Sequence, residues 1–271
     1  MTKPLFMWAG GKNKMLKHYA SVDRPSYDYY VEPFFGGGAV FLNESPEVST
    51  INDVNFEIMG IYRAVAVDPE GFIDECMVYA EEYFKRTDRK AYYYDLRKKY
   101  WEEQSPSLLY ILMKLGFNGI WQTCKASNGL FGTPSGLLNQ TKMTQVVDSG
   151  NILEWSDRLA NTKITSVDFT EVEVPPNSFV YLDPPYRDSF TTYGTGFDDE
   201  AQKRVVEYAV EASKHSTVWL ANRVVDGDDF FEAMLPKSKF HYFDVTYTAG
   251  RRKNTETGYE AKKAREFLCI V

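Results

Sequence analysis

The corner Asp183-Pro184-Pro185-Tyr186 holds residue types that could position an amine for chemistry. It follows an apolar run, 179–182, which predicts a buried strand. Two consecutive prolines fix the backbone and remove two N–H donors. The Asp183 carboxylate and the Pro184 carbonyl then remain as acceptors for the two protons of an exocyclic amine, whose lone pair would be available to an electrophilic methyl group. Tyr186 offers a flat face for a planar base. A rigid turn capped by an aspartate is the structural alternative.

A second group of residues has the spacing of a nucleoside site. A strand-like segment ends in the glycine turn 36–38, where the backbone can approach a ligand closely. Asp53 follows Glu32 by 21 residues, at the end of the next strand, where a carboxylate would accept hydrogen bonds from ribose hydroxyls. Phe41 stands where a dinucleotide fingerprint requires glycine, and no Lys-Ser/Thr pair follows the turn. The pattern therefore favours a nucleoside ligand without a pyrophosphate, and a plain structural turn is the alternative.

Strand-like and helical segments alternate along the chain, which indicates an α/β sheet. Ligands of open α/β sheets bind at the carboxyl ends of the strands, where Asp183 is expected. The expected strands are 27–33, 49–52, 162–169, 178–182, 217–221, 241–246 and 267–271. The expected helices are 38–43, 55–103, 108–115 and one capped by residues 198–200. Residues 116–150 are rich in small polar residues and predict a loop or hairpin within an insertion.

Composition excludes several classes of protein. The chain has 271 residues, 44% of them hydrophobic, so it can build a full core, unlike a disordered chain. No run of roughly 20 apolar residues predicts a membrane helix, and the N-terminus lacks a signal-peptide pattern. Three scattered cysteines do not make a disulfide scaffold, so we expect a reducing, intracellular compartment. The cysteines and three isolated histidines are expected to be structural, and no metal site is expected.

The net charge of −7 alone argues against nucleic-acid binding, but its distribution does not. Acids concentrate in 44–84 and 198–232, whereas bases concentrate in 1–18, 85–99 and 251–265. Residues 115–147 contain no acid. Basic segments that converge in the fold would form a phosphate-binding surface, and solvated faces are the alternative.

The order of the motifs resembles that of a known family, the DNA adenine N6-methyltransferases of the Dam type found in bacteria and phages. The segments that carry the resemblance are 6–12 (Phe-Met-Trp-Ala-Gly-Gly-Lys), 31–38, 52–55, 117–121 (Phe-Asn-Gly-Ile-Trp) and 183–186. The resemblance implies a Rossmann-like S-adenosylmethionine-dependent methyltransferase sheet with an inserted, mainly helical DNA-recognition domain plus hairpin. Residues 1–56 and 151–271 would form the catalytic domain, and 57–150 the target-recognition domain.

The resemblance also assigns roles to residues. S-adenosylmethionine would contact Trp8, Ala9, Gly10, Lys12, Glu32, Pro33, Phe34, Gly36, Gly38, Asp53, Asp168, Phe169 and Asp183. The catalytic residues would be Asp183, Pro184, Pro185 and Tyr186. Duplex DNA would contact Met7, Asn118, Gly119, Ile120, Gln122, Arg251, Arg252 and Lys253. The target base would swing out of the duplex, and 187–197 could cover it as a lid. A monomer in the bacterial cytoplasm, encoded by the cell or by a phage, is expected.

The sequence departs from the family pattern at two positions that would read bases. Members that methylate GATC usually carry Lys where Met7 stands and Arg where Gln122 stands. Arg pairs with guanine, whereas Gln is better suited to adenine. GATC, a different site and a relaxed site therefore stay open as recognition sequences. Two other functions also stay open: a methyltransferase acting on another amine, such as an RNA base or cytosine N4, and a non-catalytic DNA-binding protein.

Overall fold

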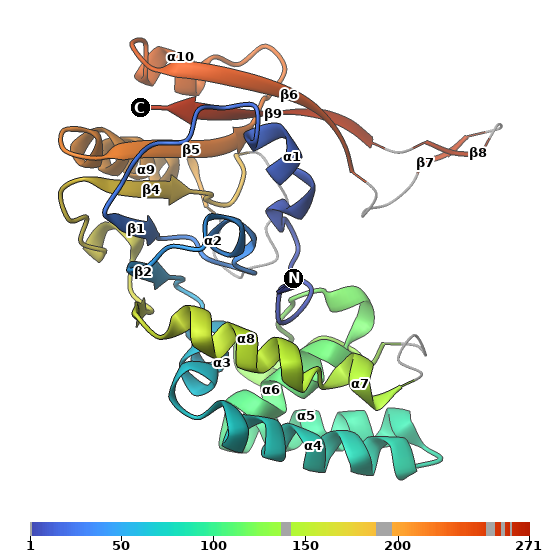
Figure 1. Ribbon diagram of the computed structural model, residues 1–271. Coiled ribbons are helices and arrows are strands. Elements are labelled where there is room, and N and C mark those ends of the chain that lie inside the picture. The colour runs from blue at the N-terminus through green and yellow to red at the C-terminus, as the bar shows by residue number, and fades with distance from the viewer. Residues whose placement is uncertain (1, 137–141, 188–196, 248–252, 256–257, 261) are drawn as a thin grey trace. The chain divides into compact units, whose positions relative to one another are not determined.

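The computed structural model describes residues 2–136, 142–187, 197–247, 253–255, 258–260 and 262–271. Seven strands form a sheet in the order β3-β2-β1-β4-β5-β9-β6, and β7 pairs with β8 separately. The strands are β1 (Tyr29–Glu32), β2 (Ser49–Asn52), β3 (Thr162–Thr165), β4 (Ser178–Leu182), β5 (Thr217–Arg223), β6 (Lys239–Tyr247), β7 (Lys253–Thr255), β8 (Gly258–Glu260) and β9 (Lys262–Ile270). The predicted α/β class with a methyltransferase-type sheet is confirmed (Figure 1).

The chain divides into two compact units. Of the described residues, the first unit lies within 2–16 and 33–172, and the second within 17–32, 173–187 and 197–271. These units do not test the functional domains expected from the sequence. The assignment of catalysis to 1–56 and 151–271, and of target recognition to 57–150, stays a prediction.

The first unit holds most of the helices. They are α2 (Ala39–Glu44), α3 (Phe56–Val67), α4 (Pro69–Lys85), α5 (Arg89–Glu103), α6 (Pro106–Leu115), α7 (Met143–Val146) and α8 (Ser149–Leu159), with short 3-10 turns at η1 (Lys12–Lys14), η2 (Phe117–Gly119), η3 (Lys125–Ser127) and η4 (Phe169–Glu171). The segment predicted as helical from 55 to 103 forms three helices. Asp68 caps α4 with Pro69 at its first position, and Asp88 caps α5, so each aspartate starts a new helix.

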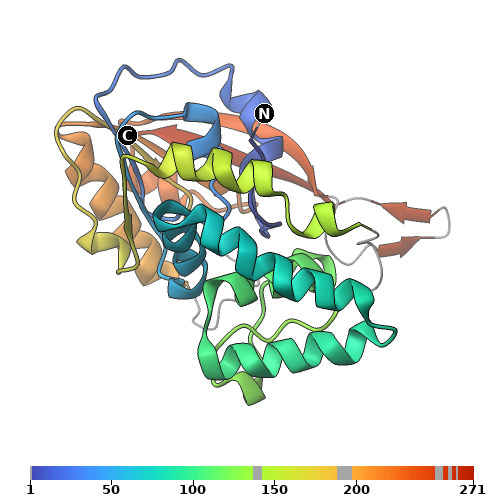
Figure 2. The same ribbon diagram turned by 60° about the horizontal axis from the view of Figure 1, so that its bottom comes forward.

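Helices α4, α5 and α6 pack side by side in the first unit (Figure 2). Helix α6 is buried over nearly its whole length, as predicted for 108–115. Helix α8 begins within the segment expected to be loop or hairpin. Its fully buried Trp155 stacks on Phe41 with ring centroids 5.9 Å apart and donates its indole N–H to the Lys3 carbonyl at 2.7 Å. Helix α8 therefore ties the N-terminal segment to the core of this unit.

The second unit is built on β4, whose five residues are all buried. Strand β4 runs parallel to both β1 and β5, and β9 runs antiparallel between β5 and β6. The short helix α1 (Leu16–Tyr19) spans the boundary between the units, and α9 (Asp199–Ser213) and α10 (Phe230–Met234) lie in the second. Asp198 caps α9 as predicted, and α9 packs on β5 (Figure 1). Among the described residues, no helix has the length and apolar character needed to cross a membrane.

Candidate active site

The glycine turn of the first unit brings three predicted cofactor residues together. Gly36 donates its N–H to Asp53 Oδ2 at 2.9 Å and accepts the Tyr62 hydroxyl at 3.0 Å. Its φ of +48° favours glycine, and a Cβ at this position would collide with the indole of Trp8. Trp8, Gly36 and Asp53 are thus neighbours, although 45 positions separate the first from the last in the sequence.

Asp53 is oriented by two backbone amides. Its second oxygen, Oδ1, accepts the Asn55 N–H at 2.9 Å. Burial raises the pKa of Asp53 to about 6, and the amides of Asn55 and Gly36 partly oppose that rise. The carboxyl is therefore mainly ionised at pH 7. A carboxylate has about four lone-pair sites, so Asp53 keeps acceptor capacity for ligand hydroxyls.

Asn52 lies in the segment 52–55 that carries the family resemblance, but it had no predicted role of its own. It ties the glycine turn to the segment after β3. Its Nδ2 donates to the carbonyls of Pro33 at 3.0 Å and Val167 at 3.1 Å, and its Oδ1 accepts the Val167 N–H at 3.0 Å. The Phe34 ring packs on the Phe169 ring with centroids 5.0 Å apart. The predicted residues on both segments therefore come together. The signal that marks Asn52 is its place at a strand end directly before Asp53.

The other predicted cofactor residues have local roles of their own. Asp168 caps η4 by accepting the Thr170 N–H at 3.1 Å. The Lys12 side chain is buried, and its Nζ donates to the Gly10 carbonyl at 3.0 Å. Gly38 precedes α2 with a φ of +66°. Glu32 lies in the second unit, where its buried carboxylate accepts the Tyr30 hydroxyl at 2.7 Å. Ala9 is exposed.

The predicted DNA-reading turn packs against the N-terminal segment of the same unit. Asn118 and Gly119 adopt left-handed conformations, with φ of +52° and +60°. Met7 lies against Gly119 so closely that a Cβ there would collide with it, and yet Met7 is 66% exposed. The Trp8 and Trp121 rings lie 5.7 Å apart, measured between centroids. An exposed apolar side chain thus lies beside a strained, exposed turn.

Residues 116–135 form a hairpin-like loop, with isolated antiparallel bridges at Gly116–Ser135 and Thr123–Phe131. Gln122 lies within this loop, partly exposed. The Gln122 carbonyl accepts the Gly132 N–H at 2.8 Å, and its N–H approaches the Thr133 hydroxyl at 3.3 Å. Ile120 is also partly exposed, and its carbonyl accepts the Thr133 hydroxyl at 2.7 Å. The backbone of the loop is therefore fixed where these two side chains emerge.

One face of α5 holds residues 131–133 of this loop through hydrogen bonds. Tyr93, Arg97 and Trp101 follow one another at four-residue spacing, which places them on one helix face. Arg97 Nη1 donates to the carbonyls of Gly132 at 2.8 Å and Thr133 at 3.1 Å. Tyr93 donates to Thr133 at 2.9 Å, and Trp101 donates to the Phe131 carbonyl at 2.8 Å. No sequence motif marks this anchor, because its partners lie 30 or more residues away along the chain.

A buried carboxylate adds a further anchor to the loop. Glu57 of α3 accepts the Tyr100 hydroxyl at 2.5 Å and the Phe131 N–H at 3.0 Å. Burial raises the pKa of Glu57. In the basic run 85–99, Lys85 and Arg86, at the end of α4, pair with acids of the last turns of α4, and Arg97 binds carbonyls. Part of that run therefore stabilises the fold instead of forming a free basic surface.

In the second unit, the Asp-Pro-Pro-Tyr corner ends β4 as predicted. Tyr186 donates its hydroxyl to Glu266 Oε2 at 2.6 Å. Burial, followed by the neighbouring Asp183 and Glu266 carboxylates, raises the pKa of Tyr186 well above its usual value. The phenol therefore stays protonated and remains a donor. Pro184 is buried, and Asp183 and Tyr186 are partly exposed.

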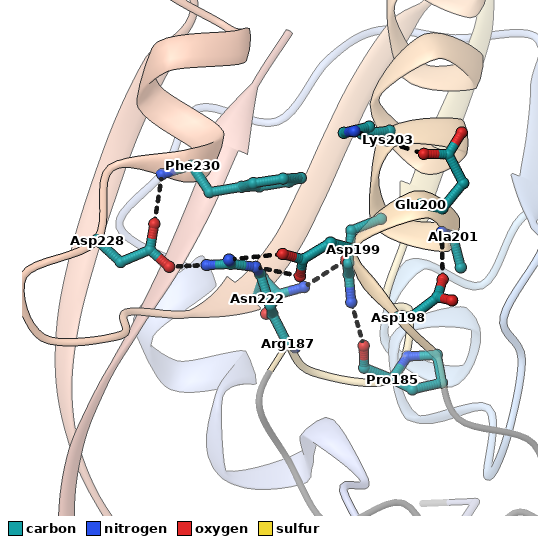
Figure 3. A network of polar contacts seen from close by, with 11 residues as sticks. Pro185, Arg187, Asp198, Asp199, Glu200, Ala201, Lys203, Asn222, Asp228 and Phe230 are labelled. Atoms are coloured by element: carbon teal, nitrogen blue, oxygen red, sulfur yellow. Dashed lines mark hydrogen bonds and ion pairs between the residues drawn. The ribbon is translucent and has the colours of Figure 1, made fainter.

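Arg187 anchors the chain directly after the corner. Its guanidinium binds Asp199 through two hydrogen bonds, at 2.7 and 2.9 Å, and pairs with Asp228 on the other side (Figure 3). The centroid of the Phe230 ring lies 4.5 Å from the guanidinium carbon of Arg187 (Figure 3). The hydrogen bonds to Arg187 lower the pKa of Asp199. Two carboxylates neutralise this arginine, so it serves the fold of the corner.

Some predicted residues fall outside what the structure describes. Arg251, Arg252 and most of the proposed lid, 188–196, lie outside the described residues, and Lys253 is placed only as the first residue of β7. Cys76 and Cys269 are buried, as expected of structural thiols, whereas Cys124 is partly exposed. In the described part of the chain, no cluster of three or more His, Cys, Asp or Glu residues could hold a metal ion.

Comparison with known proteins finds one family that matches most of the chain. The family described as D12 class N6 adenine-specific DNA methyltransferase matches residues 8–223. A type II methyltransferase of Lactococcus lactis subsp. cremoris is 29% identical, over 93% of this chain and 91% of the relative. A type II methyltransferase of Methanocaldococcus jannaschii is 29% identical, over 84% and 86%. A DNA adenine methylase of Vibrio cholerae is 29% identical, over 76% of each chain.

Proposed function

Because this chain belongs to the D12 class of N6 adenine-specific DNA methyltransferases, we propose that its two residue clusters divide the work of the reaction. The chain methylates the N6 amine of adenine in DNA. In this proposal the glycine-turn cluster of the first unit binds the methyl donor, and the corner of the second unit binds the adenine. The observation that carries it is the joining of Trp8, Gly36 and Asp53 in one cluster.

The donor set of the first cluster fits S-adenosylmethionine. Asp53 supplies a carboxylate for the ribose hydroxyls, and the Phe34–Phe169 pair supplies aromatic surface for the adenine ring. Gly36 lacks a side chain, which lets the Trp8 indole pack directly against the glycine turn beside Asp53. When bound, S-adenosylmethionine supplies a methyl group activated by its positive sulfur. No group in this cluster requires a metal ion.

The corner of the second unit would hold the acceptor. The Asp183 carboxylate and the Pro184 carbonyl would accept the two N–H bonds of the adenine amine, and Tyr186 would stack on the ring. These contacts reduce conjugation of the amine nitrogen with the ring, which makes its lone pair more nucleophilic. A duplex hides the amine in the base stack, so we propose that the target adenine is flipped out.

The surface formed by Met7, Asn118, Gly119, Ile120 and Gln122 would contact the duplex. Its support is the packing of Met7 against Gly119 and the anchored backbone around Gln122. Arg251, Arg252 and Lys253 stay predictions as phosphate contacts. The cellular location, the monomeric state and the origin of the chain in a bacterium or a phage also stay predictions.

We expect the affinity for S-adenosylmethionine to fall as the pH is lowered through about 6. The pKa of Asp53 is about 6, so the carboxyl takes up a proton in this range and loses acceptor capacity for the ribose. Hydrogen bonds to a charged group contribute about 1.5–3 kcal/mol, and a carboxyl with a pKa of about 6 is about nine-tenths protonated at pH 5. The loss of affinity between pH 8 and pH 5 should therefore be up to about tenfold. Isothermal calorimetry at a series of pH values measures it.

The Asp53→Asn variant is the control for this prediction, because it keeps the shape of the side chain and cannot titrate. It should bind S-adenosylmethionine weakly at pH 8 and show no inflection near pH 6. An inflection that persists in Asp53→Asn would assign the titration to another group and contradict the role of Asp53.

We expect the Gln122→Arg variant to change the recognition sequence in favour of guanine. Arginine can bind guanine O6 and N7 together, and such a contact discriminates against the wrong base by about 1–3 kcal/mol. Sequencing of methylated adenines in DNA treated with each enzyme measures the preference beside the target. Thr123→Arg adds the same charge at the next position and is the matched control. An identical site preference in Gln122→Arg and wild type would remove Gln122 from the reading surface.

A further inference from the structure

Three buried side chains contact the corner around Tyr186 at three separate points. Gln202 of α9 donates its Nε2 to the Pro185 carbonyl, directly before Tyr186, at 2.8 Å. Asn222 of β5 accepts the backbone N–H of Arg187, directly after it, at 3.3 Å. Glu266 of β9 accepts the Tyr186 hydroxyl at 2.6 Å. The backbone on each side of the residue and the far end of its ring are therefore all bound.

These polar side chains are buried to an unusual degree. Gln202 and Asn222 are 0% exposed and Glu266 is 4% exposed. Asn222 Nδ2 also approaches Gln202 Oε1 at 3.4 Å, and Asn222 Oδ1 accepts the Arg223 N–H at 2.9 Å. Burying an amide or a carboxylate is unfavourable unless it is hydrogen-bonded. A packed apolar residue at any of these positions would avoid that cost, so their contacts with the corner give a reason for the polar residues.

We propose that Gln202, Asn222 and Glu266 are positioning residues that fix the orientation of Tyr186 for stacking on the target adenine. The inference rests on the proposed role of Tyr186 in binding the base. A tyrosine has two rotatable side-chain angles, and these are set by a fixed backbone at one end and a bound hydroxyl at the other. An oriented ring binds a base without losing that freedom on binding.

The ion pairs of Arg187 support the same arrangement from the adjoining residue. Asp199, which binds Arg187, lies in α9 three residues before Gln202, which binds Pro185. Helix α9 therefore contacts Arg187 through Asp199 (Figure 3) and Pro185 through Gln202, which are the two neighbours of Tyr186 in the sequence. In the sequence, Asp199 is one acid of the acidic segment 198–232, and no motif connects it with the corner.

The test compares wild type with Glu266→Gln and Gln202→Leu. We expect the single-turnover rate of methyl transfer to fall about tenfold to a hundredfold in each, because a misplacement near 1 Å costs about that much. The dissociation constant for S-adenosylmethionine, measured by calorimetry, should stay the same. A fluorescent 2-aminopurine at a mapped methylation site should report less base extrusion. Rates and affinities equal to wild type in both variants would overturn the inference.

The chain offers a matched control for Glu266. Tyr242 donates its hydroxyl to Glu232 at 2.7 Å in the same unit, and neither residue contacts the corner in any described bond. Glu232→Gln makes the same chemical change to the same kind of pair. It should stay within about twofold of wild type, as substitutions away from buried networks usually do. A loss in Glu232→Gln equal to that in Glu266→Gln would make the effect general and overturn the positioning role.

A double-mutant cycle separates positioning from a general structural effect. If Glu266 acts through the Tyr186 hydroxyl, Glu266→Gln should cause no further loss in a Tyr186→Phe background, whereas independent effects would add. Additive losses would overturn the inference, and this holds even if Gln202→Leu fails to fold. Full activity in Tyr186→Ala would instead overturn the proposed role of Tyr186 in base binding. If methyl transfer is impaired in Tyr186→Ala but unaffected in Glu266→Gln and Gln202→Leu, only the positioning inference would be overturned.

Discussion

We expect the Asp183→Ala variant to transfer methyl groups to DNA at least about a thousandfold more slowly than wild type. Removing one group that stabilises developing charge typically slows a reaction by about 10²–10³-fold, and Asp183 would also hold the base in position. Asp183 directly follows β4 and precedes two prolines, and its carboxylate would accept an N–H of the adenine amine. Without it, the amine keeps its conjugation with the ring and loses its orientation. Transfer of a labelled methyl group to plasmid DNA measures the rate.

Two further variants define what this loss means. Asp183→Asn keeps the shape and one acceptor oxygen, so it should retain more activity than Asp183→Ala. Asp226→Ala removes an exposed acid of the same unit and should leave the rate within about twofold. Calorimetry should show that both Asp183 variants still bind S-adenosylmethionine through the glycine-turn cluster, with at most the single Asp183 contact implied by the family resemblance lost. Full activity in Asp183→Ala would contradict the catalytic assignment.

The second large effect is expected from Arg97→Ala, which should raise the DNA concentration needed for half-maximal methylation by about tenfold to a hundredfold. The guanidinium donates to the carbonyls of Gly132 and Thr133 in the hairpin-like loop. Hydrogen bonds from a charged donor contribute about 1.5–3 kcal/mol, and their loss leaves buried carbonyls without this partner. The loop that carries Gln122 should then lose its fixed position. The affinity for S-adenosylmethionine should not change.

Lys98→Ala is the matched control, because it removes a neighbouring exposed base of the same helix. If Lys98 contacts a phosphate, its loss should lower the salt dependence of DNA binding by about one counterion. Arg97→Ala should weaken binding with the salt dependence unchanged, since Arg97 binds protein carbonyls. A reduced salt dependence in Arg97→Ala would assign Arg97 to the phosphate surface and contradict the anchoring role.

The sequence predicted those parts of the fold whose signals are local. Strands β2 and β4 coincide with their predicted ranges, and Asp198 caps α9 because an acidic run precedes an apolar helix face. Helix α8 was missed because Ser149, Gly150 and Asn151 are typical of loops. Its buried residues Ile152, Trp155 and Leu159 have helical spacing, however, and that spacing could have identified it.

The supports of the site could not be predicted, because they depend on contacts between distant residues. Asp53 was found from its spacing, whereas Asn52 shows its role only through bonds to Pro33 and Val167. Arg97 looked like one base in a basic run, and its carbonyl partners lie 35 and 36 residues away. Glu266 lies 80 residues from Tyr186 and no motif marks it. Motifs identify groups that touch ligands, and three-dimensional packing identifies the groups that hold them.

The most direct test is the chemical identity of the methylated product. DNA would be incubated with the enzyme and S-adenosylmethionine labelled in its methyl group, then digested to nucleosides and separated. We expect label in N6-methyl-2′-deoxyadenosine with wild type, and label reduced at least about a thousandfold with Asp183→Ala. Label in N4-methyl-2′-deoxycytidine, or label in N6-methyl-2′-deoxyadenosine that persists undiminished in Asp183→Ala, would contradict it.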